Sequence, residues 1–321
     1  AWRSLTKKKG FSVVNIVGLA IGMAAALLIL TYVAFEYSYD DMHSRQDRIF
    51  RVEARFYENG ELTDDWASSS AGYATAMKQN MSAVEAYTRV GSQYYPEQVV
   101  KYNELLYRET GIGYAEANFF DFFDFKLLKG NKESCLDGPN KVVITERIAR
   151  KYFKGADPIG KILIFRSNIG EEACEVTGIM EDMPINTHIR YNLLISYKTL
   201  PKWMDEYWYR HEVYSYVLLK SANLKTQVEE DFPVMAEKYK TEEALKNKTW
   251  AIQLTNLRDI HLNPQKAYEP EVKGNRSSIW VLICTALAIL CIAWINYINM
   301  TVARSMERAK EIGIRRTSGA S

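Results

Sequence analysis

The chain has 321 residues, of which 47% are hydrophobic, and a formal net charge of +2. Because its basic residues are dispersed among acidic ones, the composition gives no support for a nucleic-acid-binding surface. No Gly/Ser-rich, Gln/Asn-rich or Pro-rich tract is present, which argues against a long disordered linker.

The sequence contains two long uncharged stretches, residues 10–35 and residues 277–303. About 20 helical residues cross the roughly 30 Å hydrocarbon core of a bilayer, and both stretches exceed that length. The first stretch could instead be a cleaved signal peptide, but a signal h-region runs about 7–15 residues and ends at a small-residue cleavage site. We therefore predict two transmembrane helices, one within residues 1–35 and one at residues 279–303.

The flanking charges predict the orientation of these helices, because Lys and Arg beside a span are retained on the cytoplasmic side. Residues 1–35 carry four basic residues and no acidic one, and residues 279–321 carry five basic residues against two acidic ones. Residues 36–278 instead hold 32 basic and 37 acidic residues. Both ends are therefore expected in the cytoplasm, including residues 304–321, and residues 36–278 are expected outside it.

Both spans carry residues that suggest packing against another helix. Gly18 and Gly22 form a Gly-x-x-x-Gly pattern that Ala26 extends, and small residues on one face allow close approach of a second helix. A Gly- and Ala-rich span facing only lipid is the alternative. Asn296 and Asn299 lie three residues apart, and amides in a bilayer need partners. They indicate a contact with another helix, or emergence of the span into the interface.

Residues 36–278 are enough for one large or two small folded domains. Arg48–Tyr57 alternates apolar and polar residues before Asn59-Gly60, which predicts a β-hairpin. Thr145 is expected to cap a helix at 146–153. Further strands are predicted at 85–90, 98–108, 142–145, 162–165, 174–180, 213–219 and 250–257, further helices at 70–81 and 224–239, and an aromatic turn or short helix at 118–125. The predicted fold class is α+β with mixed sheets, in two subdomains.

The sequence offers little catalytic chemistry. Gly155–Lys161 fits a P-loop, but Ile162 stands where Ser or Thr would hold Mg²⁺, and the segment leads from a predicted helix into a strand, so a structural turn is expected. The four His residues are scattered, and no nucleophile motif is present. We predict no enzyme, metal site or cofactor. Cys135 and Cys174 would face an oxidising compartment, where a disulfide between them is possible.

The residues after the second span, 301–321, begin as a charged helical pattern, and Gly313 and Gly319 predict a break and a turn. Such a segment suits docking into a groove of a cytosolic partner, whereas an ordinary stop-transfer segment is the simpler interpretation.

The segment Arg308–Ser321 resembles the one that follows the second transmembrane helix in MacB/FtsX-type ABC transporter permeases, the mechanotransmission class. Lys8–Gly22 resembles the first helix of that family. Four further segments resemble parts of its periplasmic core domain and follow in family order: 47–52, 142–153, 158–161 and 176–184. The resemblance therefore covers nearly the whole chain.

The resemblance implies a non-catalytic permease subunit in the bacterial inner membrane, with residues 36–278 in the periplasm. It implies a cytosolic ABC ATPase as partner, a second permease copy or homologue, and a periplasmic partner or substrate. ATP-driven motion would be transmitted to the periplasmic domain for export or extraction of an envelope substrate. Because members of the family have further spans, the chain is expected to be a fragment of a longer permease.

The contact with the ATPase is expected in the cytoplasmic segment, with Ile312 as an apolar plug, charged residues as an orienting rim and Gly313 at the turn. The residues expected to make it are Arg308, Glu311, Ile312, Gly313, Arg315 and Arg316. A two-span receptor with a periplasmic sensor domain is the alternative, since it shares the topology. A receptor would continue into a heptad-patterned helix, which Gly313 and Gly319 would interrupt. A membrane-anchored envelope hydrolase lacks any catalytic constellation here.

Overall fold

The computed structural model describes residues 9–91, 97–167, 170–205, 208, 210–239, 248–270 and 273–319. The chain divides into a helical unit, Ala1–Ser38 with Gly274–Ser321, and a compact unit, Tyr39–Lys273. Each unit is described by itself.

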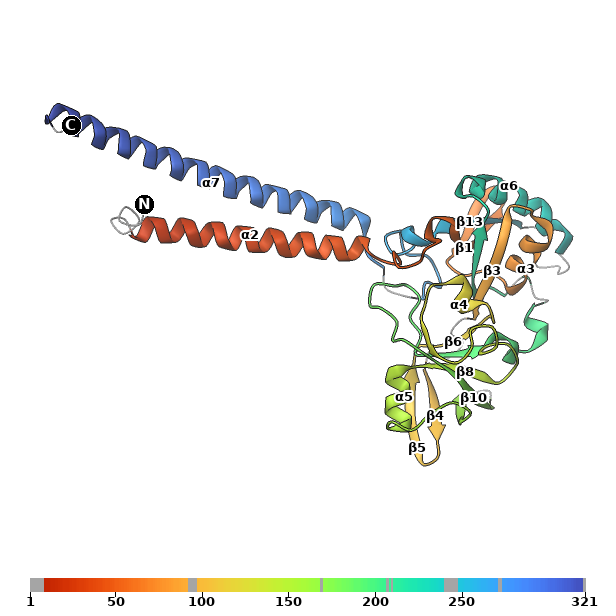
Figure 1. Ribbon diagram of the computed structural model, residues 1–321. Helices are drawn as coiled ribbons and strands as arrows, with labels where there is room; N and C mark the ends of the chain where they lie inside the picture. Colours follow the sequence, from red (N-terminus) through yellow and green to blue (C-terminus); the bar gives the residue numbers. More distant parts are fainter. Residues whose placement is uncertain are drawn as a thin grey trace. The chain divides into compact units, whose positions relative to one another are not determined.

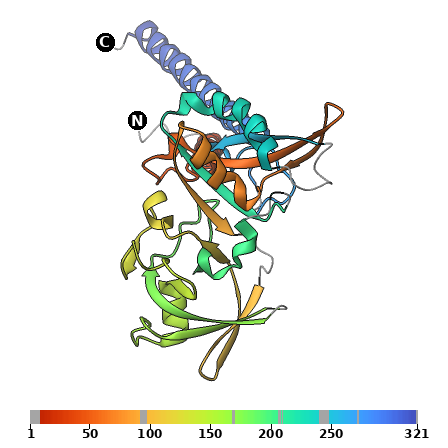
Figure 2. The same cartoon turned by 90° about the vertical axis from the view of Figure 1, so that its right-hand side faces the viewer.

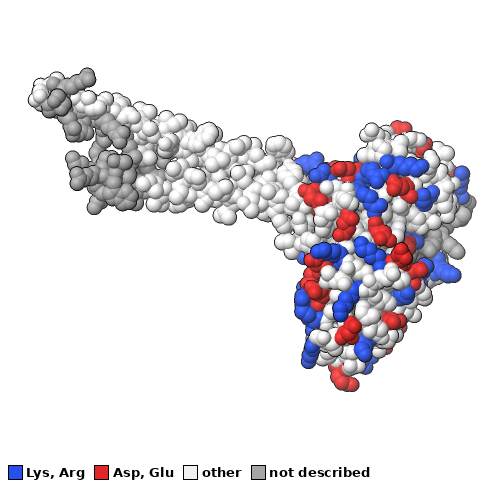
Figure 3. Space-filling model, viewed as in Figure 1, with Lys and Arg blue, Asp and Glu red and all other residues white. Residues whose placement is uncertain are grey.

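The helical unit consists of α2 (Lys9–Tyr37) and α7 (Arg276–Thr317), which lie side by side (Figure 1). Ile16–Tyr37 and Arg276–Ala303 are long and apolar enough to cross a membrane, and only 11% and 17% of their most apolar windows are buried. A core helix of a soluble protein would be mostly buried. Figure 3 shows both helices white over these apolar segments, whereas Lys, Arg, Asp and Glu are spread over the compact unit.

The predicted break at Gly313 is wrong, because α7 continues through this residue to Thr317. One Gly inside a helix costs only about 1 kcal/mol relative to Ala, and the Arg, Lys and Glu residues around it favour a helix. Gly319 lies beyond the helix end and has a positive φ of 75°.

The compact unit is built on one sheet. The described strands are β1 (Ile49–Glu58), β2 (Glu61–Trp66), β3 (Val84–Gly91), β4 (Glu97–Tyr102), β5 (Leu105–Thr110), β6 (Ile112–Ala115), β7 (Leu127–Lys129), β8 (Lys141–Thr145), β9 (Ile162–Ser167), β10 (Gly170–Met180), β11 (Leu193–Ser196), β12 (Val213–Leu219) and β13 (Thr249–Asn256). Their order is β13-β1-β12-β3-β6-β11-β8-β10-β9-β4-β5, with β2 also paired to β1 and β7 to β10. The pairs β10–β8 and β11–β6 are parallel, so the sheet is mixed, as predicted.

The helices of the compact unit are α3 (Ala71–Asn80), α4 (Phe119–Phe122), α5 (Glu146–Phe153) and α6 (Lys225–Ala236). Short 3₁₀ turns occur at η1 (Gln46–Arg48), η2 (Tyr197–Thr199), η3 (Lys202–Asp205), η4 (Ala222–Leu224), η5 (Glu237–Tyr239) and η7 (Leu257–Asp259). The α+β class predicted from the sequence is therefore confirmed.

Many of the predicted elements are present. Asn59 and Gly60 join β1 to β2 with φ values of 52° and 84°, the positive values that a two-residue hairpin turn needs. The hydroxyl of Thr145 accepts a hydrogen bond from Ile148 N at 3.4 Å at the start of α5. The stretch 98–108 is a hairpin of β4 and β5 rather than one strand.

The expected turn at Gly155–Lys161 is confirmed between α5 and β9. Gly160 N donates to Val176 O at 2.8 Å, and Val176 N donates to Lys161 O at 2.8 Å. These backbone groups are thus used to join the turn to β10. Cys135 and Cys174 are both buried free thiols in different core clusters, so the possible disulfide is not formed.

The two subdomains expected from the sequence are the two ends of this one sheet (Figure 2). Where they meet, β3 and β6 share only two residue pairs, Val90 with Ala115 and Gly91 with Tyr114. The strand ladder therefore continues from one end to the other through a narrow joint.

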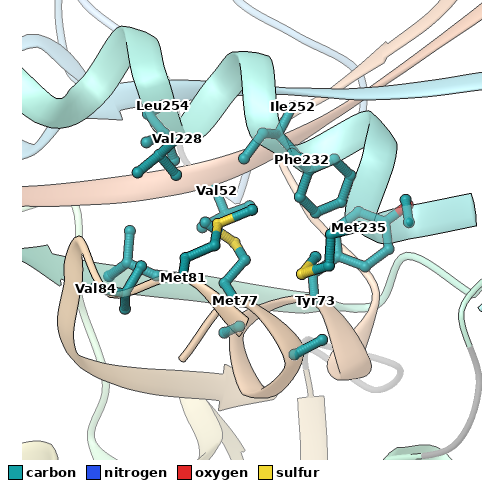
Figure 4. Close-up of a cluster of buried hydrophobic side chains, with 14 of the residues drawn as sticks. Val52, Tyr73, Met77, Met81, Val84, Val228, Phe232, Met235, Ile252 and Leu254 are labelled. Atoms are coloured by element: carbon teal, nitrogen blue, oxygen red, sulfur yellow. The ribbon is translucent and has the colours of Figure 1, made fainter. Parts of the chain in front are cut away.

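Among the described residues, three large clusters of apolar side chains cover the sheet, and Ala71, Tyr197 and Val213 form a smaller one. At one end, alternate residues of β1, β12 and β13 pack against α3 and α6, with Val52, Met77 and Phe232 fully buried (Figure 4). The other residues of β12 face a second cluster that contains α4. At the opposite end of the sheet, α5 covers a third cluster on β8, β9 and β10.

Candidate functional site

Helices α2 and α7 pack along a seam whose positions recur every three or four residues. This spacing is typical of helices that cross at a small angle in a left-handed pair. The buried and half-buried residues with this spacing are Leu19, Gly22, Ala26, Ile29 and Val33 in α2, and Ile279, Leu282, Ala286, Ile289 and Ala293 in α7.

The structure places three of the five predicted packing residues on this seam. A Cβ atom on Gly22 would lie 3.5 Å from Ile289, and Ala26 is fully buried. Asn296 is half-buried and continues the spacing of the α7 seam residues. Gly18 is exposed, with no described atom within 4 Å of an added Cβ, and Asn299 is also exposed.

The predicted coupling segment is the end of α7, which continues past the apolar span from Ala303 to Thr317. Ile312 is 57% exposed, and Gly313 has no described atom within 4 Å of an added Cβ. The four charged residues of the prediction belong to α7 by backbone, and their side chains lie outside the described part of the structure: Arg308, Glu311, Arg315 and Arg316.

Two segments of the compact unit are continuous in sequence with the helices. Residues 39–43 follow α2, and we name them the first anchor. Residues 266–270 and Lys273 precede α7, and we name them the second anchor. Each contains a non-glycine residue with a φ of 59°, Asp40 in the first and Tyr268 in the second. This region is rare for such residues and persists where surrounding contacts determine the backbone.

Asp40 holds the first anchor. Its carboxylate accepts from the Thr187 hydroxyl at 2.5 Å and lies 2.7 Å from His188 Nδ1, while Asp40 N donates to Asn186 O at 3.0 Å. Burial would raise the pKa of Asp40, but His188 and the Thr187 hydroxyl outweigh it and lower the pKa below its usual value. Nε2 of His188 lies 2.9 Å from the Tyr216 hydroxyl, which joins the anchor to β12.

His43 is the last residue of the first anchor, and its imidazole ring is buried and uncharged. Its Nδ1 accepts from Asp124 N at 3.1 Å, and its ring packs on Phe123 and Phe125 with centroids 5.3 and 5.0 Å away. Burial lowers the pKa of His43 to about 4, although the carboxylates of Asp40 and Asp124 act in the opposite direction. At neutral pH the anchor therefore contains an uncharged imidazole.

Arg51 of β1 holds the second anchor, and its side chain is fully buried. Its two terminal nitrogens lie 2.6 and 3.1 Å from the Glu269 carboxylate, and Nε and Nη2 lie 3.0 and 2.7 Å from Glu53 Oε1. Lys273 pairs with Glu269 at 2.6 Å, and Lys266 pairs with Glu53 at 2.8 Å. Each of the two buried anions thus contacts two cations.

The electrostatics of the second anchor follow from this pairing. Burial would raise the pKa of Glu53, but Arg51 and Lys266 lower it below its usual value. Burial would lower the pKa of Arg51, but Glu53 and Glu269 raise it. Burial lowers the pKa of Lys273 despite its bond to Glu269. Such groups hold chain segments in place because a displaced anchor would leave a buried charge without its partner.

Among the residues that the structure describes, no three His, Cys, Asp or Glu side chains gather so that they could hold a metal ion. The anchor residues were not predicted as functional from the sequence. Arg51 and Glu53, which hold the second anchor, alternate with apolar residues along β1, which is also the pattern of a strand with one solvent-exposed face.

Residues 12–233 match the family described as the MacB-like periplasmic core domain. None of the curated proteins compared matches the chain. Among solved structures, a domain from Porphyromonas gingivalis, whose parent protein is thought to be a permease, is 23% identical with a TM-score of 0.59, and the match covers 72% of this chain and 96% of that one. This likeness supports the fold.

Two further structures match with lower TM-scores. The extracellular domain of the noncanonic ABC-type transporter YknZ from Gram-positive bacteria is 16% identical, with a TM-score of 0.43 and coverage of 64% of this chain and 100% of that one. The periplasmic region of MacB from Actinobacillus actinomycetemcomitans is 14% identical, with a TM-score of 0.41 and coverage of 62% and 87%.

Replacing Arg51 by Met should destabilise the compact unit by about 3–5 kcal/mol, because the buried carboxylates of Glu53 and Glu269 lose their shared partner. The matched control is Arg55→Met on the same face of β1, where the 3.4 Å pair with Asp65 is about 30% exposed and should cost less than about 1 kcal/mol. Urea unfolding of the full chain, followed by tryptophan fluorescence, measures both. Equal losses would contradict a holding role for Arg51.

His43 should make the stability of the compact unit fall as the pH falls from about 6.5 to about 4. Its pKa is about 4 when folded, against an ordinary value of 6.5, so the unfolded chain binds more protons in this window and stability rises with pH. The contribution is up to roughly 3 kcal/mol. His43→Asn keeps an acceptor for Asp124 N but cannot titrate, so it should flatten the pH dependence of unfolding. An unchanged slope would show that His43 does not cause it.

Proposed function

The chain belongs to the MacB-like periplasmic core domain family, and on this basis we propose that it is a permease subunit of an ABC transporter that transmits motion from a cytosolic ATPase to an extracytoplasmic domain. In the proposed topology, residues 1–35 form the cytoplasmic lead-in and the first span. Residues 279–303 form the second span. Residues 36–278 lie in the periplasm, and residues 304–321 form the cytoplasmic coupling segment.

The charge distribution supports insertion in a bacterial inner membrane with this orientation. The apolar segments Ile16–Tyr37 and Arg276–Ala303 are largely exposed, as expected for helices that contact lipid. The excess of basic residues at both ends favours the cytoplasm for them. Family membership supports an ABC ATPase as partner, and we propose a second permease copy or homologue beside it, with export or extraction of an envelope substrate as the outcome.

The observation that carries the proposal is the continuity of α7. This helix is uninterrupted from Arg276, next to the second anchor in sequence, to Thr317, beyond the apolar span. Its part after Ala303 is about 20 Å long at 1.5 Å per residue. The backbone hydrogen bonds of a continuous helix resist extension and bending. A displacement at the cytoplasmic end would therefore be transmitted along α7 and would not be absorbed at a break near Gly313.

Because α7 is continuous, the sequence argument that separated a permease from a two-span receptor no longer holds. A signalling receptor also needs an unbroken helix after its second span, so Gly313 no longer separates the two functions. Membership of the family over residues 12–233 favours the permease.

We propose that the contact with the ATPase lies on the exposed end of α7. Residues three or four apart share one helical face, so Arg308, Ile312 and Arg315 can meet a partner together, with Glu311 and Arg316 beside them. Ile312 is exposed although it is apolar, which fits a role as a plug in a groove.

Replacing Gly313 by Leu should abolish the stimulation of ATPase activity by the transport substrate while membrane insertion and the periplasmic fold persist. No described atom of this chain lies within 4 Å of an added Cβ, so a partner is what would oppose the larger side chain. Gly313→Ala adds one carbon, favours the helix and should retain most of the stimulation. The measurement is ATP hydrolysis by the full-length permease reconstituted with its ATPase. Unchanged stimulation in the Leu variant would remove Gly313 from the contact.

A further inference from the structure

The two anchors converge on one pair of residues in the sheet. Arg51 of β1 and Tyr216 of β12 are direct partners in the antiparallel ladder of these strands. Side chains of such partners lie on the same face, with Cβ atoms about 4.5–5.5 Å apart. Both side chains are buried, Arg51 fully and Tyr216 to 2% exposure.

Tyr216 is connected to the first anchor by two sets of contacts. Its hydroxyl lies 2.9 Å from Nε2 of His188, whose Nδ1 is paired with Asp40. Its ring also meets Phe123 edge to face, with centroids 5.2 Å apart, and Phe123 packs on His43 of the same anchor. A movement of residues 39–43 therefore changes the surroundings of Tyr216 both through a hydrogen bond and through ring packing.

Arg51 contacts the second anchor through two hydrogen bonds to the Glu269 carboxylate. On β12, Tyr214 lies on the same face as Tyr216, two residues away, and its hydroxyl donates to the carbonyl of Tyr268 at 2.7 Å. The second anchor thus contacts both β1 and β12, and β12 also contacts the first anchor through Tyr216. A fork of two charge-assisted bonds tolerates little displacement, because its geometry requires both oxygens in place.

We propose that Arg51 and Tyr216 are positioning residues that form a shared seat for the two anchors. Loosening one anchor at this seat loosens the other, so the segments that follow α2 and precede α7 respond together. This inference rests on the proposed function, since it names where motion of the two helices would enter the periplasmic sheet.

Hydrogen exchange of the full-length chain in lipid nanodiscs, read by mass spectrometry without any ATPase, tests the seat. Tyr216→Phe removes only the hydroxyl that contacts His188. Amides of residues 39–43 and 186–188 should exchange roughly 2- to 10-fold faster, as expected for one lost hydrogen bond, and amides of residues 266–270 should also exchange faster. The matched control is Tyr214→Phe, which removes the hydroxyl that donates to the Tyr268 carbonyl of the second anchor. Acceleration confined to the first anchor in Tyr216→Phe would overturn the proposal.

A double-mutant cycle keeps the test decisive if Tyr216→Phe fails to fold. Asp40→Asn and Glu269→Gln each weaken one anchor, and independent sites combine additively to within about twofold in the unfolding equilibrium constant. A shared seat predicts a deviation of more than about threefold, whereas strict additivity would overturn it. Both measurements concern the permease alone. A coupled seat in a full-length permease that neither binds nor stimulates an ABC ATPase would therefore refute the proposed function and leave this inference standing.

Discussion

The burial of the Arg51 guanidinium is the constraint on which the helix-connected side of the compact unit depends. A charge removed from water is tolerated only when opposite charges and hydrogen-bonding groups replace the solvent. Glu53, its neighbour along β1, supplies part of this requirement, and Glu269, 218 residues away in the chain, supplies the rest. The segment before α7 must therefore bring Glu269 to Arg51, and this charge pairing acts together with the backbone bond from Ala67 N to Ala267 O and the ring contact of Tyr268 with Trp66.

The need to pair buried polar groups also explains the contacts of the first anchor and the different composition of the two faces of the sheet. The face of β1 and β12 toward α3 and α6 is apolar and belongs to a closed core. The other face combines aromatic rings with buried polar groups, including Tyr216, Thr255 and Arg51. Apolar packing has no direction, whereas a fork or an Asp-His-Tyr chain has one geometry. The polar face is thus the one suited to fix the position of the segments that are continuous in sequence with the helices.

The sequence predicted the elements whose signals are local. Periodicity, the Asn59-Gly60 turn and the Thr145 cap predicted β1, β2 and α5, and the long uncharged stretches predicted α2 and α7. Strands of three or four residues such as β6, β7 and β11 were not predicted, because a few apolar residues carry no period. The anchors could not be predicted either: Arg51 and Glu53 alternate with apolar residues as on a half-exposed strand, and their burial depends on tertiary contacts such as those with Glu269 and Lys266. The break assigned to Gly313 was wrong because propensity at one residue is weak against a helix of 42 residues.

The seam of the helices and the two anchors differ in how they resist movement. Along the seam, Gly22, Ala26, Ala286 and Ala293 contact through small apolar surfaces, and in a bilayer no hydrophobic effect drives such contacts. At the second anchor, displacement of the chain would separate ions that are buried and paired at 2.6–3.1 Å. Under the proposed function, movement of the helices relative to each other would therefore be easier than detachment of either anchor from the sheet.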